Sequence, residues 1–578
     1  MNMTANGIFR KACAVLTVLS VMGMTATAQN KRTISVWQDN QESVLDVYAI
    51  DSMVIQDDGK LNVYGLYTDE SFSTDQVDSM TVRFPEIVST NKISIDSLKA
   101  IFNALDVKNK AFKAPPYKNP LMGHKFGADP FGMVDGDRLY VYMTDDHLYR
   151  STDGKPITGS FDYTDCKSVT IISSDDLVNW TDHGTQPVAG GPASWASQMW
   201  APCAAHKTID GKEKYFLYFS NNSSGIGVLT ADTPYGPWTD PIGKAMIDHS
   251  TANCSGKLVP SVYDPAVLID DDGKAYLYFG GGIDNLDAAD PGSARCVQLG
   301  DDMTSIVGTP VEIRPPCLFE DAGINKVGGK YLYSYCANFN ADGGPGRGNV
   351  GYMKSDNPLG PFTYVGCCSE NPGGASWAGG GGNHHHAIVE FKGKYYLLYH
   401  NRALKSAMRS STPDINDNVE LRSTCISEIK VNTTNATITN LKASDLSQTG
   451  VAQLKNFDPY QTVQGATMAW ENGVTTKYNK PNRYCSAEMT SGSWMCLSNV
   501  DFRNGPVGFT AEVKGKGAIK ICLRVPGKSA KTVVLAQVPN NSSYQTITVP
   551  VVESVTGVQE KVYIVAEGSI SIKSWSFF

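Results

Sequence analysis

Five short motifs between residues 120 and 405 contain the side chains best suited to chemistry in this 578-residue chain. After each motif come a few apolar residues, a glycine-containing turn and a tyrosine-rich segment. The motifs contain, in chain order, Asp129, Trp200, Asp264, Glu320 and the histidines 384–386. Three of the five therefore present a carboxyl group. Two carboxyl groups with different proton affinities can divide the roles of acid and base between them.

The spacing of the motifs indicates which elements must position them. Successive copies lie roughly 55 to 75 residues apart, the length of one propeller blade with long loops. Long helical patterns are absent between residues 115 and 440, whereas turn signals such as Asp135-Gly136 and Asp272-Gly273 are frequent. We therefore predict an all-β fold in which residues 115–440 form a five-bladed β-propeller. The innermost strand of each blade is expected to bring one motif to the central axis.

The sequence around these motifs resembles glycoside hydrolase family 43 over roughly residues 115–430. The elements that carry the resemblance, in order, are Asp129-Pro130, Met199-Trp200-Ala201-Pro202, Asp264-Pro265-Ala266-Val267, Phe319-Glu320-Asp321 and His385-His386-Ala387-Ile388. An isolated Asp-Pro pair is common, but all these elements in one order are specific. The resemblance implies a five-bladed propeller and hydrolysis with inversion at the anomeric carbon. It is strongest to members that act on arabinoxylan.

The resemblance also implies roles for the three carboxylates. Asp129 corresponds to the general base, Glu320 to the general acid, and Asp264 to a third carboxylate that orients Glu320 and raises its pKa. An inverting glycosidase needs its base and acid roughly 6.5–9.5 Å apart, because a water molecule must fit between them. Innermost strands of different blades can hold two residues across a channel at such a distance. The alternative interpretation is that these are ordinary turn carboxylates.

Three further residues are predicted to contact substrate. Trp200 would form an apolar wall for a sugar ring, and Arg402 would bind a sugar hydroxyl or the base carboxylate. Phe131, two residues after Asp129, is the third predicted contact. A packed tryptophan and a solvated arginine are the alternatives for the first two.

The resemblance places His385 in the channel beneath the active site, where the family histidine often touches a bound calcium ion whose other ligands are mostly water. Three consecutive histidines leave the register open, so His384 or His386 could take that place. Calcium prefers oxygen ligands. A histidine that is only hydrogen-bonded inside the channel is therefore the alternative to a metal ligand.

The last part of the chain, residues 455–578, resembles carbohydrate-binding module family 6 and is predicted to be a β-sandwich. The matching segments are 457–462, 468–471, 492–494, 500–502 and Trp575. Gly465 and Ser574 stand where the family usually has acidic calcium ligands, so we predict a sandwich without that calcium. Tyr484 and Trp494 are candidate glycan contacts, although Trp494 could instead belong to the core.

Residues 1–28 resemble a secretory signal. Arg10 and Lys11 form a positive end, residues 14–24 a short apolar stretch, and residues 26–28 a small-residue cleavage site. The apolar stretch is too short to span a membrane. We therefore expect an exported protein, either periplasmic or secreted.

Two segments separate this signal from the propeller. Residues 29–90 are predicted to form a small β-rich module without an assigned role, because segments 50–54 and 77–81 repeat one pattern after alternating apolar residues. Residues 91–114 are predicted to be a partly helical linker, since apolar residues between 94 and 105 have helical spacing.

Composition excludes several classes of protein. The net charge is −8 and Lys/Arg runs are absent, which argues against a nucleic-acid partner. Nothing after residue 28 is apolar for long enough to cross a bilayer. Of 13 cysteines, Cys13 lies in the signal-like segment. The rest include no CxxC motif, so buried thiols are expected rather than a zinc site.

The sequence therefore favours an exported inverting glycosidase that removes α-L-arabinofuranosyl groups from arabinoxylan or its oligosaccharides. A β-xylosidase or xylanase on the same scaffold is the alternative enzyme, because loops set substrate choice. A non-catalytic glycan-binding protein is the alternative class. The presence of all three carboxylates argues against it.

Overall fold

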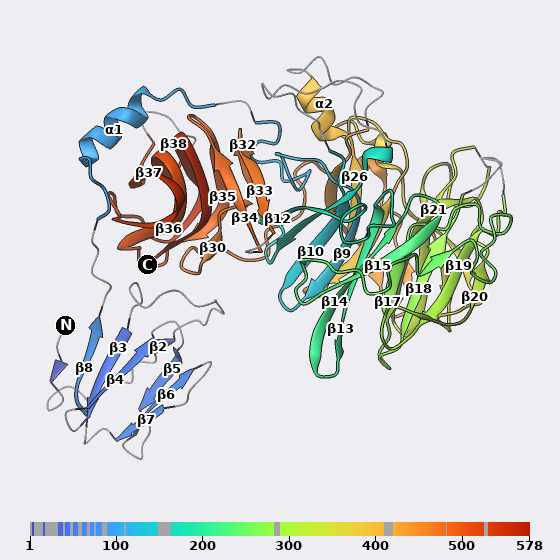
Figure 1. Ribbon diagram of the computed structural model, residues 1–578, viewed down its shortest axis with the longest axis horizontal. Coiled ribbons are helices and arrows are strands. Elements are labelled where there is room, and N and C mark those ends of the chain that lie inside the picture. Colours follow the sequence, from blue (N-terminus) through green and yellow to red (C-terminus); the bar gives the residue numbers. More distant parts are fainter. Residues whose placement is uncertain are drawn as a thin grey trace.

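The computed structural model describes residues 89–578, apart from 109–110, 148–162, 283–288, 341, 410–419, 481–482 and 525–529, together with eight short strands before residue 89. Nearly all of its regular structure is β-strand, which confirms the predicted all-β class. Figure 1 shows a small N-terminal body, a sandwich and a propeller. Among the described residues, no helix is both long and apolar enough to cross a membrane.

The propeller has five antiparallel sheets, each built from strands that are consecutive in the chain, apart from one strand that the C-terminal sandwich adds to the first sheet. The first two blades contain β9 (Ala128–Asp135), β10 (Arg138–Thr144), β11 (Ser168–Ser174), β12 (Trp180–Pro187), β13 (Trp200–Ile209), β14 (Lys212–Ser220), β15 (Gly225–Ala231) and β16 (Ile247–Asp248). The third and fourth contain β17 (Ala266–Ile269), β18 (Ala275–Gly280), β19 (Ala294–Leu299), β20 (Ile306–Ile313), β21 (Leu318–Val327), β22 (Lys330–Ala337), β23 (Val350–Ser355) and β24 (Thr363–Ser369). The fifth contains β25 (His386–Phe391), β26 (Lys394–Asn401) and β27 (Ser423–Ile429). The innermost strands of the five blades are β9, β13, β17, β21 and β25. Each contacts the next in this order, and β25 contacts β9, which closes the ring.

The repeated glycine and tyrosine positions each have a structural role. Every first hairpin turn contains a glycine with positive φ, namely Gly136, Gly211, Gly273, Gly329 and Gly393, a conformation that glycine adopts without strain. Every second strand contributes a fully buried tyrosine, namely Tyr142, Tyr218, Tyr278, Tyr333 and Tyr399. The hydroxyls of the first three donate to carbonyl oxygens of the next blade, those of Pro234, Met303 and Pro358. The tyrosine-rich strands therefore tie neighbouring blades together.

The ring closes where the segment before β9 runs beside β27 of blade 5. Asn119 exchanges two hydrogen bonds with the backbone of Ile426, and the Leu121 amide donates to the Thr424 carbonyl at 2.8 Å. Gly127 then bridges to Ser423. This segment leads directly into β9, so closure fixes the start of the strand on which Asp129 lies.

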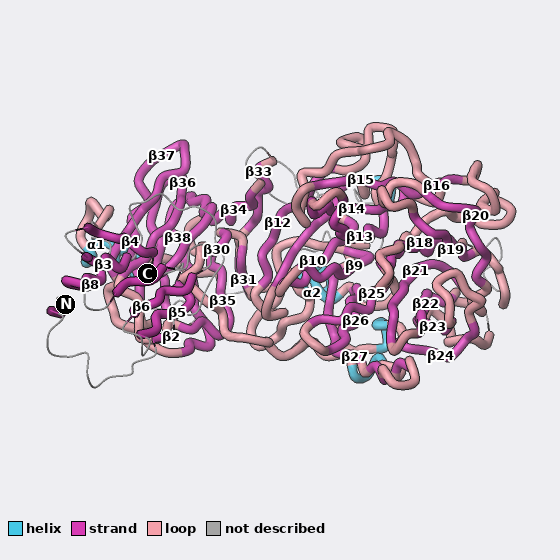
Figure 2. The backbone as a smooth tube through the Cα atoms, turned by 90° about the horizontal axis from the view of Figure 1, so that it is seen from below, coloured by secondary structure: helices cyan, strands magenta, loops and turns pink. Residues whose placement is uncertain are grey.

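The C-terminal sandwich packs a continuous apolar core between its sheets. Its strands are β30 (Val463–Gln464), β31 (Thr467–Met468), β32 (Trp470–Asn472), β33 (Thr475–Asn479), β34 (Tyr484–Met489), β35 (Trp494–Asp501), β36 (Gly508–Cys522), β37 (Thr532–Pro550) and β38 (Val558–Phe577). Strand β31 pairs with β12, so the sandwich adds a fifth strand to blade 1. Figure 2 shows the sandwich beside this blade. In the chain, the segment between propeller and sandwich contains β28 (Val431–Asn432), β29 (Thr437–Ile438) and the 3-10 helix η4 (Ala443–Asp445).

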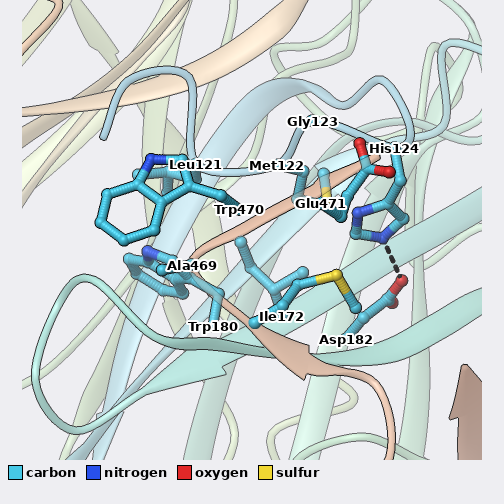
Figure 3. Close-up of a pocket in the computed structure, with 11 residues that line it drawn as sticks. Leu121, Met122, Gly123, His124, Ile172, Trp180, Asp182, Ala469, Trp470 and Glu471 are labelled. Atoms are coloured by element: carbon cyan, nitrogen blue, oxygen red, sulfur yellow. Dashed lines mark hydrogen bonds and ion pairs between the residues drawn. The ribbon is translucent and has the colours of Figure 1, made fainter. Parts of the chain in front are cut away.

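Buried charges join the sandwich to blade 1. Asp182 of β12 contacts His124 at 2.8 Å and Lys125 at 2.7 Å, and it accepts a hydrogen bond from Thr476 of the sandwich at 2.7 Å. A pocket beside this cluster is lined from both domains, with His124 directed at Asp182 and with Glu471 nearby (Figure 3). Separating the domains would break the Thr476 hydrogen bond and the β12–β31 pairing and would open the pocket to water, so we regard sandwich and propeller as one packed unit.

The predicted linker helix is present as α1 (Ile95–Ala104), and it covers the sandwich. The Ser94 hydroxyl caps it by accepting from the Ser97 amide at 3.1 Å. Leu98 and Phe102 lie buried in one cluster with Trp494. Trp494 is only 5% exposed, and its indole N–H donates to the Lys108 carbonyl at 2.7 Å. The prediction that Trp494 contacts glycan is therefore wrong, because the linker covers its ring.

The other short helices border the propeller's loops. They are α2 (Ala403–Arg409) and the 3-10 helices η2 (Tyr163–Asp165) and η3 (Pro372–Gly374). All cysteines among the described residues are free thiols, and all but Cys367 are buried. This agrees with the predicted buried thiols.

The strands before residue 89 form two small sheets, with orders β1-β8-β3-β4 and β2-β5-β6-β7. They are β1 (Met3–Thr4), β2 (Leu16–Thr17), β3 (Thr33–Gln38), β4 (Gln41–Asp46), β5 (Ile50–Ile55), β6 (Lys60–Gly65), β7 (Glu70–Ser73) and β8 (Val77–Arg83). The two repeated segments become β5 and β8, one in each sheet. Apart from β1 and β2, the predicted signal over 1–28 lies outside the described residues.

We predict that Leu98→Ala lowers the free energy of unfolding by about 2–5 kcal/mol, because it removes a buried side chain and leaves a cavity under Trp494. Chemical denaturation followed by tryptophan fluorescence measures the change. Lys99→Ala, at the next and exposed position of α1, is the matched control. Equal stability of the two variants would show that α1 does not pack on the sandwich as described.

Candidate active site

The motif residues gather at the end of the channel where the innermost strands begin. Asp129, Trp200 and Glu320 lie in the first residues of β9, β13 and β21, and Asp264 precedes β17 by two residues. Asp129 and Asp264 have positive φ values of 48° and 53°. Non-glycine residues rarely adopt this conformation, and such strain tends to occur at functional sites. Asp129 and Glu320 lie on different sheets, as predicted.

Asp129 is buried and accepts strong hydrogen bonds at both oxygens. Oδ1 accepts from Arg422 Nη1 at 2.7 Å, and Oδ2 accepts from the Thr144 hydroxyl at 2.8 Å. The Asp129 amide donates to His400 Nδ1 at 3.0 Å. Burial pushes the pKa of Asp129 upward, but the charge of Arg422, followed by electrostatic interactions with His385 and His400, outweighs burial and lowers the pKa to about 2. Asp129 is therefore ionised at neutral pH.

Glu320 has the opposite environment. Its Oε1 is buried without a hydrogen-bond partner, and Oε2 lies 3.5 Å from the Tyr263 hydroxyl. Burial, followed by the negative charge of Asp129, raises the pKa of Glu320 to about 8. A hydrogen bond from the Asn383 side chain offsets part of this rise. A protonated Glu320 can thus coexist with an ionised Asp129, with Oε1 as the atom that can donate a proton.

Asp264 is held by backbone and by a hydroxyl. Its Oδ2 accepts from the Asp321 amide at 3.0 Å, and its own amide donates to the Ser220 hydroxyl at 2.8 Å. Burial raises the pKa of Asp264 well above its usual range, and repulsion from Glu320 adds to this. Glu320 is therefore close enough to disfavour the ionisation of Asp264.

The three consecutive histidines occupy different positions. His385 faces the carboxylates, with Nδ1 3.7 Å from Asp129 and 3.8 Å from Asp264, and with Nε2 3.1 Å from Asp321. His386 bonds to Asp321 and to the Ser334 hydroxyl, while His384 is fully buried. His385 is thus the histidine beside the carboxylates.

The surroundings of His385 do not form a calcium cage. Calcium takes about six to eight oxygen ligands. Across the part of the chain that the structure describes, no three His, Cys, Asp or Glu side chains converge on a possible metal position. The Asp321 oxygen nearest His385 already faces its Nε2. These residues fit at most an ion held mainly by water.

The predicted substrate contacts have different locations. Trp200 is half-buried at the carboxylate end of the channel, where its indole N–H donates to the Tyr163 carbonyl at 2.8 Å and its ring meets that of Tyr163 edge-on. Phe131 lies further along β9, on the lining of a cavity of about 310 Å³ inside the channel. His206, Asn325 and Glu390 also line this cavity.

Arg402 is paired with Glu420, its Nε 3.0 Å from Oε2, and the arginine that reaches Asp129 is Arg422. The option that Arg402 binds the base carboxylate is therefore wrong. Arg422, Thr144 and His400 were not predicted from the sequence. None of these three residues lies in a repeated motif. Arg402 and Arg422 both follow the fifth tyrosine-rich strand, so the local sequence does not show which of the two arginines contacts Asp129.

Comparison with known proteins identifies the class of this chain. The family model for glycosyl hydrolases family 43 matches residues 117–434, and that for the carbohydrate binding module (family 6) matches residues 464–578. The first match spans more than half of the chain, which therefore belongs to glycosyl hydrolase family 43. It is a glycoside hydrolase with a C-terminal family 6 module.

Particular relatives refine this picture. The arabinoxylan arabinofuranohydrolase of Paenibacillus polymyxa is 40% identical over 521 residues, covering 84% of this chain and 78% of that protein. A crystal structure of a family 43 arabinoxylan arabinofuranohydrolase from Bacillus subtilis in complex with cellotetraose has a TM-score of 0.73 and 38% identity. The match covers 81% of this chain and 99% of that one. A xylosidase/arabinosidase of Bacteroides ovatus is 29% identical over 322 residues, 49% of this chain and 88% of that protein.

We predict that Arg422→Gln raises the pKa of Asp129, because the charge that offsets burial is removed while most of the side-chain volume stays. A raised pKa means that Asp129 becomes ionised only at higher pH. The acidic limb of the kcat/KM profile should therefore move to higher pH. Arg402→Gln, which removes the neighbouring arginine paired with Glu420, should leave this limb in place. An unmoved limb in Arg422→Gln would contradict the assignment.

Proposed function

We propose that this enzyme removes α-L-arabinofuranosyl groups from arabinoxylan or its oligosaccharides with inversion at the anomeric carbon. The observation that carries the proposal is the opposite ionisation of two buried carboxyl groups in one channel. The pKa of Asp129 is lowered to about 2 and that of Glu320 is raised to about 8. Pairs of carboxyl groups whose pKa values are pushed apart identify the base and the acid of a hydrolase.

In the proposed mechanism, Asp129 removes a proton from a water molecule as the water attacks the anomeric carbon. The contacts from Arg422 and Thr144 hold this carboxylate in place while leaving lone pairs for the water. Glu320 donates its proton, through the unpartnered Oε1, to the oxygen of the leaving group. Asp264 is proposed to orient Glu320 and, in its ionised form, to disfavour ionisation of Glu320 by repulsion.

The choice of an arabinofuranosyl substrate draws on the relatives from Paenibacillus polymyxa and Bacillus subtilis, which cover most of the chain. Trp200 supports it by presenting a half-buried ring beside the carboxylates. We retain Arg402 and Phe131 as proposed substrate contacts, Arg402 through a sugar hydroxyl. A β-xylosidase activity is the second candidate, because the Bacteroides ovatus relative carries both activities in its name.

We propose that the sandwich binds glycan through Tyr484. Its ring meets that of Tyr544 edge-on at 5.7 Å, and the Lys573 ammonium lies 5.2 Å from the Tyr484 ring centre. The sandwich calcium is proposed to be absent: a Cβ atom at Gly465 would lie 1.9 Å from the Ile572 carbonyl oxygen, leaving no room for an acidic side chain there.

Export and channel calcium remain proposals. Arg10, Lys11 and the apolar residues 14–24 support export to the periplasm or the medium. A calcium ion beside His385 would be coordinated mainly by water, and no step of the proposed mechanism uses it.

Incubation with arabinoxylan should release arabinose as the main monosaccharide, measured by anion-exchange chromatography. The control Asp129→Asn should fold normally and release almost none, because an amide cannot accept the proton from water. Release of xylose would favour the β-xylosidase alternative, and xylo-oligosaccharides would indicate a xylanase. Absence of any product would favour the glycan-binding alternative.

Glu320→Gln should lower kcat on arabinoxylan by roughly 10²- to 10⁴-fold, because an alkoxide leaving group needs a proton. The loss should be much smaller on an aryl arabinofuranoside, whose phenolate departs without help. The ratio of the two losses is the measurement, and equal losses would show that Glu320 is not the acid.

Asp264→Asn should move the alkaline limb of the kcat/KM profile to lower pH. Glu320 must be protonated to act. The shift requires that Asp264 ionises before Glu320, because only then does the substitution remove a negative charge that raises the pKa of Glu320. An unmoved limb would mean that Asp264 is uncharged there and that burial and Asp129 alone raise the pKa of Glu320.

A further inference from the structure

Asp146 is a buried carboxylate next to the site that has no role in the chemistry described above. It follows β10 of blade 1 and is completely shielded from solvent. Its Oδ2 accepts from Arg422 Nε at 2.9 Å and from the Arg422 amide at 2.7 Å, and its Oδ1 accepts from Nη2 at 2.9 Å. The remaining guanidinium nitrogen, Nη1, donates to Asp129 at 2.7 Å. One guanidinium thus joins two carboxylates through different atoms.

We propose that Asp146 is a positioning residue that restricts Arg422 to a single hydrogen bond with Asp129. A guanidinium binds a carboxylate most strongly through two parallel hydrogen bonds. Asp146 occupies the Nε–Nη2 edge of Arg422 in this way. Without Asp146, the Nε–Nη2 edge of Arg422 would turn to Asp129 and form hydrogen bonds with both carboxylate oxygens. The lone pair of Asp129 that receives the proton from water would then be covered.

The surroundings of Arg422 leave it few other positions. Its side chain is only 2% exposed, so the guanidinium cannot reach solvent. The Tyr163 ring lies 5.4 Å from the guanidinium carbon, and the Arg422 carbonyl accepts from the Gly127 amide at 3.1 Å. Within these contacts the guanidinium divides its hydrogen bonds between Asp146 and Asp129, so Asp146 determines which carboxylate receives two of them.

This inference rests on the proposed role of Asp129 as the base, and Asp146→Asn tests it. An asparagine keeps the size but presents an N–H₂ group to one guanidinium N–H, so the two-bond pairing is lost. We expect kcat to fall by roughly 10²-fold, as misplacements near 1 Å can cause, with little change in KM. Thermal stability should fall as well, because a buried ion pair loses one partner, so kcat is measured well below the melting temperature of the variant. Asp145→Asn is the matched control. Asp145 is the adjacent carboxylate, which accepts from the Thr170 hydroxyl, and its variant should keep wild-type kcat.

A double-mutant cycle separates positioning from a general structural effect. Lysine at position 422 has no planar fork and cannot bridge the two carboxylates in the same way. If Asp146 acts through Arg422, Asp146→Asn should cause little further loss of kcat in the Arg422→Lys background. Equal losses of kcat in both backgrounds would overturn the proposal.

Failure of this inference can be distinguished from failure of the proposed function. A wild-type enzyme that releases no arabinose would refute the proposed function. An active wild type with an equally active Asp146→Asn variant would refute the positioning role. A crystal structure of Asp146→Asn decides the point independently of activity, because we expect Arg422 to contact both oxygens of Asp129. An unchanged single contact from Nη1 would overturn the inference.

Discussion

The guanidinium of Arg422 lies between two buried carboxylates of blade 1, Asp129 at the start of β9 and Asp146 after β10. Arg422 itself precedes β27 in blade 5, 293 residues after Asp129. The ion pair therefore forms only when the last blade meets the first. Asn119, which bonds to Ile426 within β27, and Gly127, whose amide donates to the Arg422 carbonyl, reinforce the same junction. The geometry of the proposed base thus depends on closure of the whole ring.

The same interaction explains why two carboxyl groups in one channel differ in ionisation. Burial raises the pKa of both Asp129 and Glu320, because the low-dielectric interior disfavours charge. Only Asp129 has a guanidinium in contact, and this lowers its pKa to about 2. Glu320 faces the negative charge of Asp129 instead, and its pKa rises to about 8. A single buried cation therefore sets the division between base and acid.

The sequence predicted the features that each blade repeats. Asp129, Asp264 and Glu320 were found because every motif stands at the start of an innermost strand, and the glycine turns and buried tyrosines recur with the same period. Contacts made by ring closure do not repeat. The sequence therefore did not reveal Arg422. The contact with the base carboxylate was instead considered for Arg402, 20 positions earlier. The sequence left Trp494 open between glycan contact and core for a related reason, since the linker that covers it lies nearly 400 residues away in the chain, as its bond to Lys108 shows.

The sandwich is part of the same packed unit. Its strand β31 extends blade 1, and Thr476 contributes to the buried cluster around Asp182. Blade 1 also supplies Asp129 and Asp146. The sheet that carries the base is therefore supported on one side by ring closure and on the other by the sandwich.

The anomeric configuration of the first sugar released tests most directly whether Asp129, held ionised by Arg422, acts as a base toward water. Proton NMR during the first minutes of hydrolysis of an α-L-arabinofuranoside should show the β anomer before mutarotation mixes the two forms. Initial appearance of the α anomer would mean that configuration is retained. Asp129 would then attack the sugar as a nucleophile, which would contradict this account.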